Sequence, residues 1–100
     1  MLIAGNTLKR KNTNINLNNI VRHKVEPSGI NISLTEWPMR GGKYTVSINL
    51  TDFSSNIITL KKFLNENDAK KYYHKVLTSI NNGKYKLHLF DSGDVKLTLM

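Results

Sequence analysis

An α+β domain is the fold class that this sequence predicts: two layers, with one amphipathic helix packed on one face of a mainly meander antiparallel sheet. Three observations lead to it. Apolar and polar residues alternate in several short segments, one segment carries apolar residues at helical spacing, and turn-forming residues separate the segments. The expected order is ββββαββ, with about six strands. The sequence length suits a single compact domain, which we place at 20–100.

The first hairpin is expected to join strands at 20–25 and 30–35 through a four-residue turn rich in turn-forming residues. Pairing Val25 with Ile30 places the apolar residues of both strands on one face, as a register must when one face is buried. His23 would then lie on the core face as a partly buried histidine.

The next strand is expected at 43–50, where apolar residues again occupy every second position. In the register that pairs Leu34 with Tyr44, residues 37–42 (WPMRGG) form the connection, because Pro38 cannot donate to a central ladder. The stretch is therefore interpreted as a hairpin loop.

A fourth strand is expected at 57–64. Ile58 and Leu60 would face inward, but Ile57 and Phe63 have the opposite parity. This strand is therefore covered on both sides or contains a bulge.

The one expected helix spans 66–82. Asn65 is suited to cap its N-terminus and Gly83 to end it. Its apolar stripe has the i, i+3, i+4 spacing of an amphipathic helix and comprises Ala69, Tyr72, Tyr73, Val76, Leu77 and Ile80.

A last hairpin is expected after the helix. A three-residue loop at 91–93 pairs Leu89 with Val95 and keeps the apolar residues of both strands on one face. Gly93 then takes the left-handed position that such a turn requires.

Residues 1–19 are rich in asparagine and show no clean period. They are expected to form either a basic arm or an edge segment. Lys9, Arg10 and Lys11 make the densest run of charge in the sequence.

The charge balance is strongly basic, with 15 lysines and arginines against 7 acids and a net charge of +8. Such a balance favours polyanionic partners such as nucleic acid. There are no cysteines, and no apolar run has the length of a signal peptide or a membrane span. A cytoplasmic protein without a membrane partner is expected. The thirteen asparagines, with abundant lysine and isoleucine, suggest an AT-rich genome.

Catalytic and metal-binding motifs are not found in the sequence. His23, His74 and His88 are not at ligand spacing, and a zinc site needs three or four ligands. Turns and the start of the helix account for every acid except Glu36, and no helix follows the glycines at 41–42 to hold a phosphate. We therefore expect a protein that is not an enzyme and has no metal or cofactor.

The outer face of the sheet, opposite the helix, is the expected site. By parity it collects basic, hydroxyl and amide side chains together with Trp37, Phe63, Phe90 and His88. Trp37 either folds back over the hairpin or offers a plane on which a base stacks. With the basic loops included, the candidate nucleic-acid-binding residues are Lys9, Arg10, Lys11, Arg22, Lys24, Trp37, Arg40, Lys43, Lys61, Lys84, Lys86 and Lys96.

The function predicted from these features is that of a small nucleic-acid-binding accessory protein of a phage or mobile element, with single strands favoured over duplex. Two alternatives stay open. One is a protein-interaction module, such as a phage-encoded inhibitor that docks on an acidic or nucleic-acid-binding surface of a host protein. The other is a structural subunit that buries the open sheet face in a homodimer.

Overall fold

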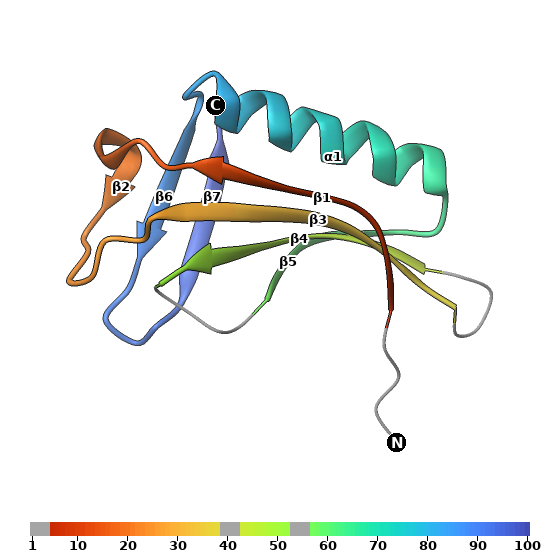
Figure 1. Cartoon of the computed structure of the whole chain (residues 1–100), viewed down its shortest axis with the longest axis horizontal. Helices are drawn as coiled ribbons and strands as arrows, with labels where there is room; N and C mark the ends of the chain where they lie inside the picture. The colour runs from red at the N-terminus through yellow and green to blue at the C-terminus, as the bar shows by residue number, and fades with distance from the viewer. Residues whose placement is uncertain (1–4, 39–42, 53–56) are drawn as a thin grey trace.

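The computed structural model describes residues 5–38, 43–52 and 57–100, which form two sheets and one α-helix, an α+β architecture (Figure 1). Sheet A has the spatial order β1-β3-β4-β5 and contains β1 (Asn6–Asn14), β3 (Gly29–Trp37), β4 (Lys43–Thr51) and β5 (Ile58–Phe63). Sheet B has the order β2-β6-β7 and contains β2 (Ile20–Val21), β6 (Tyr85–Leu89) and β7 (Val95–Leu99). All described strand pairs are antiparallel except β2 with β6.

A single apolar core joins the helix α1 (Glu66–Asn81) to both sheets. The helix lies over β3, β4 and β5, and β6 and β7 run across the strands of sheet A near the end of the helix (Figure 1). Sheet A therefore has an inner face, which the helix and sheet B cover, and an outer face, on which none of the described helices or strands packs, although Thr45 and Ser47 at its centre are buried. The buried core residues are Ile20, Ile30, Ile32, Leu34, Val46, Ile48, Leu50, Ala69, Tyr73, Val76, Ile80, Tyr85, Leu87 and Leu89.

The expected helix is confirmed, together with the signals that start and end it. The Asn65 side chain accepts hydrogen bonds from the backbone N–H groups of Asn67 and Asp68, which satisfies two donors of the first turn. Gly83 has a left-handed φ of 72° and ends the helix without the strain that a side chain would cause there. Within the described ranges, no helix has the length and apolarity needed to cross a membrane.

The expected C-terminal hairpin is also confirmed. Leu89 pairs with Val95, and Tyr85 pairs with Leu99. The Phe90 N–H donates to the Asp94 carbonyl at 3.0 Å, which leaves a three-residue loop, and Gly93 has a φ of 91°. The loop length is therefore the one that keeps both apolar sets on the core face.

The expected hairpin between 20–25 and 30–35 is wrong. The partner of β3 is β1, which runs antiparallel to it at the edge of sheet A. Only Ile20 and Val21 are in a strand, and they pair in parallel with β6 in the other sheet. Arg22 has a left-handed φ of 55°, which interrupts the extended backbone directly after Val21.

The loop that replaces the expected strand changes the position of His23. His23 lies in this loop rather than on the core face of a strand; the residue is exposed although its side chain is only 28% accessible, and its Nδ1 lies 3.8 Å from a carboxylate oxygen of Glu26. Val25 is 53% exposed and is not part of the core. The alternation of apolar residues in this stretch therefore did not reflect a buried face.

The hairpin of β3 and β4 forms with the expected faces but with a register displaced by two residues. Leu34 pairs with Val46 rather than with Tyr44, and Trp37 pairs with Lys43. Trp37 is thus the last residue of β3 rather than part of the connection. A displacement of two residues preserves every face, because side chains alternate with a period of two.

The fourth strand contains the bulge that its parity allowed. The register of β4 with β5 shifts between Val46, which pairs with Lys61, and Ser47, which pairs with Thr59. Leu60 is the extra residue, and it reverses the faces of the residues that follow. Phe63 consequently lies on the inner face, opposite Tyr44.

Candidate functional site

The outer face of sheet A presents polar side chains in rows that cross its strands. The rows arise because β3 and β4 each place apolar residues on the inner face and small polar residues on the outer face. Thr7, Thr35, Thr45 and Lys62 form the first row; Arg10, Ser33, Ser47 and Thr59 form the second; Asn12, Asn31 and Asn49 form the third. The face thus offers hydroxyl groups, amides and cations side by side.

These rows line two adjoining hollows of about 430 and 270 Å³. The larger hollow runs over the hydroxyl and amide rows from Arg10 on β1 to Thr59 on β5. The smaller one lies beside it and is bounded by Lys43 and Lys62. Trp37 lines both, so it stands where they meet.

Trp37 is held in one position on this face. Its indole N–H donates to the Thr45 hydroxyl oxygen at 2.9 Å. Gly5 lies against the ring so closely that a Cβ there would come within 2.9 Å of the indole Cδ2 and within 2.5 Å of the Thr35 methyl carbon. The residue as a whole remains 37% exposed. The ring is therefore folded onto the sheet and fixed, in a residue that is not fully buried.

The electrostatic character of these hollows is positive. Arg10, Lys43 and Lys62 line them, and none of the described lining residues is acidic. Two acids elsewhere have local partners: Glu66 pairs with Lys70 at 2.9 Å, and the Tyr44 hydroxyl donates to Glu36 at 2.9 Å on the inner side. Within the described part of the chain, no carboxylate lines either hollow.

The asparagine row contains one hydrogen-bond acceptor without a donor. The Asn31 Oδ1 atom is buried and has no partner within the described ranges. An unmet acceptor of this kind costs roughly 1–3 kcal/mol. A donor supplied by a ligand or by water would offset that cost.

Arg10, Trp37 and Lys43 are the predicted site residues that the structure brings together on this face. Lys9 and Lys11 flank Arg10 on β1 but pair with Leu34 and Ile32, so they point to the inner side. The basic run is therefore divided between two faces of an edge strand. Arg40 lies outside the described residues.

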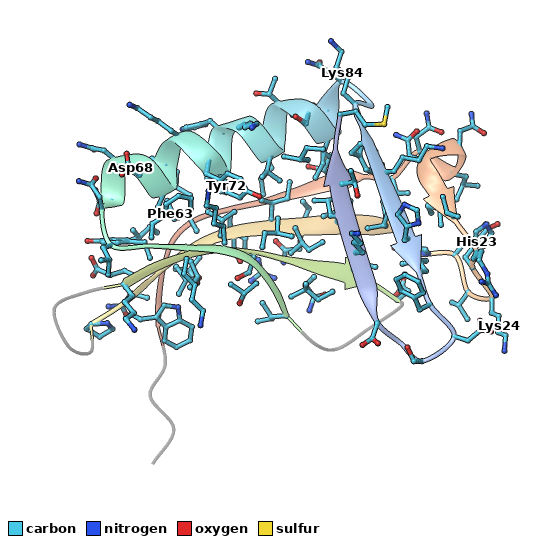
Figure 2. The ribbon with its side chains drawn as sticks, turned by 180° about the vertical axis from the view of Figure 1, so that it is seen from behind. His23, Lys24, Phe63, Asp68, Tyr72 and Lys84 are labelled. Atoms are coloured by element: carbon cyan, nitrogen blue, oxygen red, sulfur yellow. The ribbon has the colours of Figure 1, made fainter. Side chains whose placement is uncertain are left out.

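Lys62 is a site residue that the sequence reasoning missed. The bulge in β5 places it on the outer face, opposite Thr45, where Lys61 had been expected. Lys61 lies instead on the helix side, with its Nζ 5.4 Å from the Phe63 ring centroid and 5.6 Å from that of Tyr72. Figure 2 shows Phe63 and Tyr72 side by side between the helix and the sheet. The one sequence signal that Lys62 could replace Lys61 on the outer face was the presence, within 57–64, of apolar residues on both alternating sets of positions.

Lys84, Lys86 and Lys96 do not lie on sheet A, which corrects the expectation of one continuous basic face. They belong to β6, β7 and the residue before β6, with Lys86 opposite Thr98 and His88 opposite Lys96. The apolar side of this hairpin joins the common core, so its lysines form a separate surface; the two strands of the hairpin lie in the foreground of Figure 2.

The two remaining basic residues, Arg22 and Lys24, lie in the loop after β2. They line a third hollow of about 230 Å³ with Leu89, Phe90 and Asp91. Figure 2 shows Lys24 at the far end of the molecule from Phe63. This hollow contains an acid and is not continuous with the outer face of sheet A.

The outer face of sheet A combines cations, hydroxyl groups and amide groups with one fixed aromatic ring. Among the described residues, no group of three or more histidines, aspartates and glutamates could hold a metal ion. Cations, hydroxyls, amides and one fixed aromatic ring are the groups that neutralise phosphates, bond to backbone oxygens and stack on bases.

Comparison of the chain with protein-family models, with curated proteins and with solved structures finds no match. The function is therefore inferred from the geometry and charge of the molecule itself.

Proposed function

We propose that the outer face of sheet A binds single-stranded nucleic acid without catalysing a reaction. The observation that carries this proposal is a sheet face whose described hollows have no acidic lining residue and contain rows of hydroxyl and amide groups, a fixed indole at one end and three cations along the sides. The net charge of +8 draws a polyanion toward the protein from a distance.

The cations supply most of the affinity in this proposal. Arg10 lies on β1, at one side of the larger hollow, whereas Lys43 and Lys62 bound the smaller one. A strand that crosses the sheet along the polar rows places successive phosphates near these charges. Release of the counterions condensed on those phosphates then makes the binding strongly salt-dependent.

Single strands are favoured over duplex because of Trp37. Its ring is held against the sheet by Thr45 and Gly5, and its exposed part offers a preformed plane. An unpaired base can stack on that plane, whereas the bases of a duplex are already stacked on one another. Serine, threonine and asparagine side chains bond equally well to sugar and phosphate oxygens, so little sequence preference is expected.

The test is fluorescence anisotropy with labelled single-stranded and double-stranded oligonucleotides across a salt series, combined with the intrinsic fluorescence of the only tryptophan. Trp37→Ala should weaken single-strand binding by roughly 1–3 kcal/mol through lost stacking. The wild-type indole emission should change when an oligonucleotide is added.

The matched control is the double variant Lys71→Gln/Lys75→Gln. Both lysines are exposed on α1, away from sheet A, and their loss lowers the net charge without touching the proposed site. The site variant to compare with it is Arg10→Gln/Lys62→Gln, which removes the same number of charges from the proposed site. If both double variants weaken oligonucleotide affinity equally, the result would contradict a defined site. Tryptophan emission that does not respond to bound oligonucleotide would contradict stacking on Trp37.

A further inference from the structure

The acceptor of Asn31 that has no donor belongs to a residue in the wall of the larger hollow. Asn31 is half-buried and lines this hollow with Arg10 and Ser33. Its Oδ1 atom is buried and has no hydrogen-bond partner within the described ranges, so Asn12 and Asn49, which pair with it on either side, do not donate to it. Native proteins contain few such atoms, and each one needs an explanation. A ligand that occupies the hollow is one source of the missing donor.

The other polar groups of the hollow do not require a donor from outside. Ser33, Ser47 and Thr59 carry hydroxyl groups, which donate or accept according to the rotation of the O–H bond. The guanidinium of Arg10 only donates. Acceptor oxygens such as those of phosphates can therefore satisfy all of these groups. The amide oxygen of Asn31 differs because it only accepts, and a phosphate oxygen leaves it unmet.

This difference between the groups of the hollow bears on the choice between RNA and DNA. The sugar–phosphate backbone of DNA offers oxygen acceptors and no hydrogen-bond donor, whereas each ribose of RNA adds a 2′-hydroxyl, which both donates and accepts. The N–H groups of the bases are the other donors of a nucleic acid. In the site proposed above, a base stacks at Trp37, where the two hollows meet, and the sugars and phosphates follow the polar rows. The donor that reaches the asparagine row is then the ribose hydroxyl.

We propose that the outer face of sheet A is a site for single-stranded RNA, in which Asn31 Oδ1 accepts a hydrogen bond from a ribose 2′-hydroxyl. This inference rests on the proposed function and names its substrate class. The last torsion of an asparagine side chain has a broad energy profile, so the amide can turn toward the hollow without a change in the backbone. Because Oδ1 has no partner in the free protein, its rotation breaks no hydrogen bond made by that oxygen.

Thr13 provides a matched control for Asn31. Its Oγ1 atom is the other buried side-chain atom without a partner among the described residues, but Thr13 pairs with Ile30 and therefore lies on the inner face, away from the hollow. Asn31→Leu and Thr13→Val each remove one unmet polar atom and keep a similar side-chain volume. Neither variant should lower the melting temperature of the free protein, because no hydrogen bond of the removed atom is lost. Only Asn31→Leu should change binding.

The test is fluorescence anisotropy with three labelled oligouridines that differ only at the 2′ position, where they carry a hydroxyl, a hydrogen or a fluorine. The 2′-fluoro sugar keeps the pucker of ribose but has no donor. The wild type should bind the ribose oligomer roughly two- to tenfold more tightly than either of the others, the range expected for one neutral hydrogen bond. Asn31→Leu should abolish this preference, and Thr13→Val should keep it. Asn31→Asp should also keep it, because it retains an acceptor and its added charge weakens binding of all three oligomers alike.

The possible failures of this test are distinguishable. Equal affinity of the wild type for the three oligomers would overturn the preference for RNA and leave the proposed function intact. A preference that survives in Asn31→Leu, or a clearly lower melting temperature of that variant, would overturn the role of Asn31. An equal loss of affinity for all three oligomers in Asn31→Leu would identify a base N–H as the donor and overturn the contact with ribose. Absence of binding to any oligomer would contradict the proposed function and this inference together.

Discussion

Lys61 and Lys62 provide a test of the proposed site within two adjacent residues. The bulge in β5 places Lys62 on the outer face of sheet A, where it lines the smaller hollow with Trp37 and Lys43. Lys61 lies on the other side of the same strand, over the rings of Phe63 and Tyr72. Lys62→Gln and Lys61→Gln remove the same charge from neighbouring positions, so long-range attraction is weakened equally in both variants.

The expected magnitude follows from one lost phosphate contact. For single strands, the slope of log K against log salt changes by about 0.7 for each phosphate that a cation neutralises. Lys62→Gln should therefore flatten the slope by about 0.7, which corresponds to a roughly fivefold loss of affinity at about 0.1 M salt. Lys61→Gln should leave the slope unchanged within error.

The assay is anisotropy with a labelled oligothymidine at several salt concentrations, together with thermal unfolding of each variant. Lys61→Gln should lower stability by roughly 0.5–1 kcal/mol, because it removes a cation from two aromatic rings at an exposed site. Lys62→Gln should not. The two variants would thus show opposite patterns of binding and stability.

Equal losses of affinity and slope from the two substitutions would refute this reasoning. That result would mean that binding responds to net charge alone and that the outer face of sheet A is not the contact surface.

Three further predictions concern the fold. Ile48→Ala should lower the free energy of unfolding, measured by chemical denaturation, by roughly 2–5 kcal/mol, because Ile48 is fully buried in the core. A decrease below about 0.5 kcal/mol would contradict its place in the core. Removal of residues 1–14 should lower the melting temperature clearly, since β1 pairs with β3 along its length; an unchanged value would show that β1 adds no stability. The pKa values of Tyr44 and Tyr73 are raised above 10.0, the first chiefly by its hydrogen bond to Glu36 and the second by burial. The folded state therefore holds these phenol protons more tightly than the unfolded state, so stability is fully present below pH 10.0 and falls as pH rises through the folded pKa values. Tyr44→Phe should reduce the loss of stability at alkaline pH, measured by denaturation at a series of pH values. A pH profile identical to that of the wild type would contradict a contribution from Tyr44.

The elements that the sequence predicts correctly are those whose signals are local. Asn65 caps the helix and Gly83 ends it within a single segment, and the loop before Val95 has the length that its Gly93 turn requires. Each of these signals depends only on neighbouring residues. Local chemistry was therefore sufficient to place the helix and the last hairpin.

The strand β1 was harder to predict because it carries no alternation. It is an edge strand with exposed residues along both faces, so no apolar period marks it. The segment 20–25 does show a period, but it contributes only Ile20 and Val21 to a strand. The choice of β1 rather than 20–25 as the partner of β3 depends on contacts far apart in the chain, which periodicity does not report.

For the strands, the sequence predicted which face a residue occupies but not the residue with which it pairs on the neighbouring strand. The two-residue displacement of β3 against β4 left Ser33, Thr35, Thr45 and Ser47 on the expected outer face, so the face of these residues was predicted correctly. The one-residue bulge in β5 exchanged Lys61 for Lys62. Parity also gives the face of a residue within its sheet but not which sheet it joins, so the lysines of sheet B were assigned to the wrong surface.

The most direct test of the central claim is a two-dimensional amide NMR titration of the protein with a short oligothymidine. The Trp37 indole N–H donates to the Thr45 hydroxyl at 2.9 Å on the outer face of sheet A. Binding on that face should shift the indole N–H signal together with the amide signals of Ser33 and Ser47. The amides of β6 and of α1 should not move beyond the effect of salt. Shifts confined to Lys84, Lys86 and Lys96, or no shift at the indole under saturating oligonucleotide, would contradict the claim.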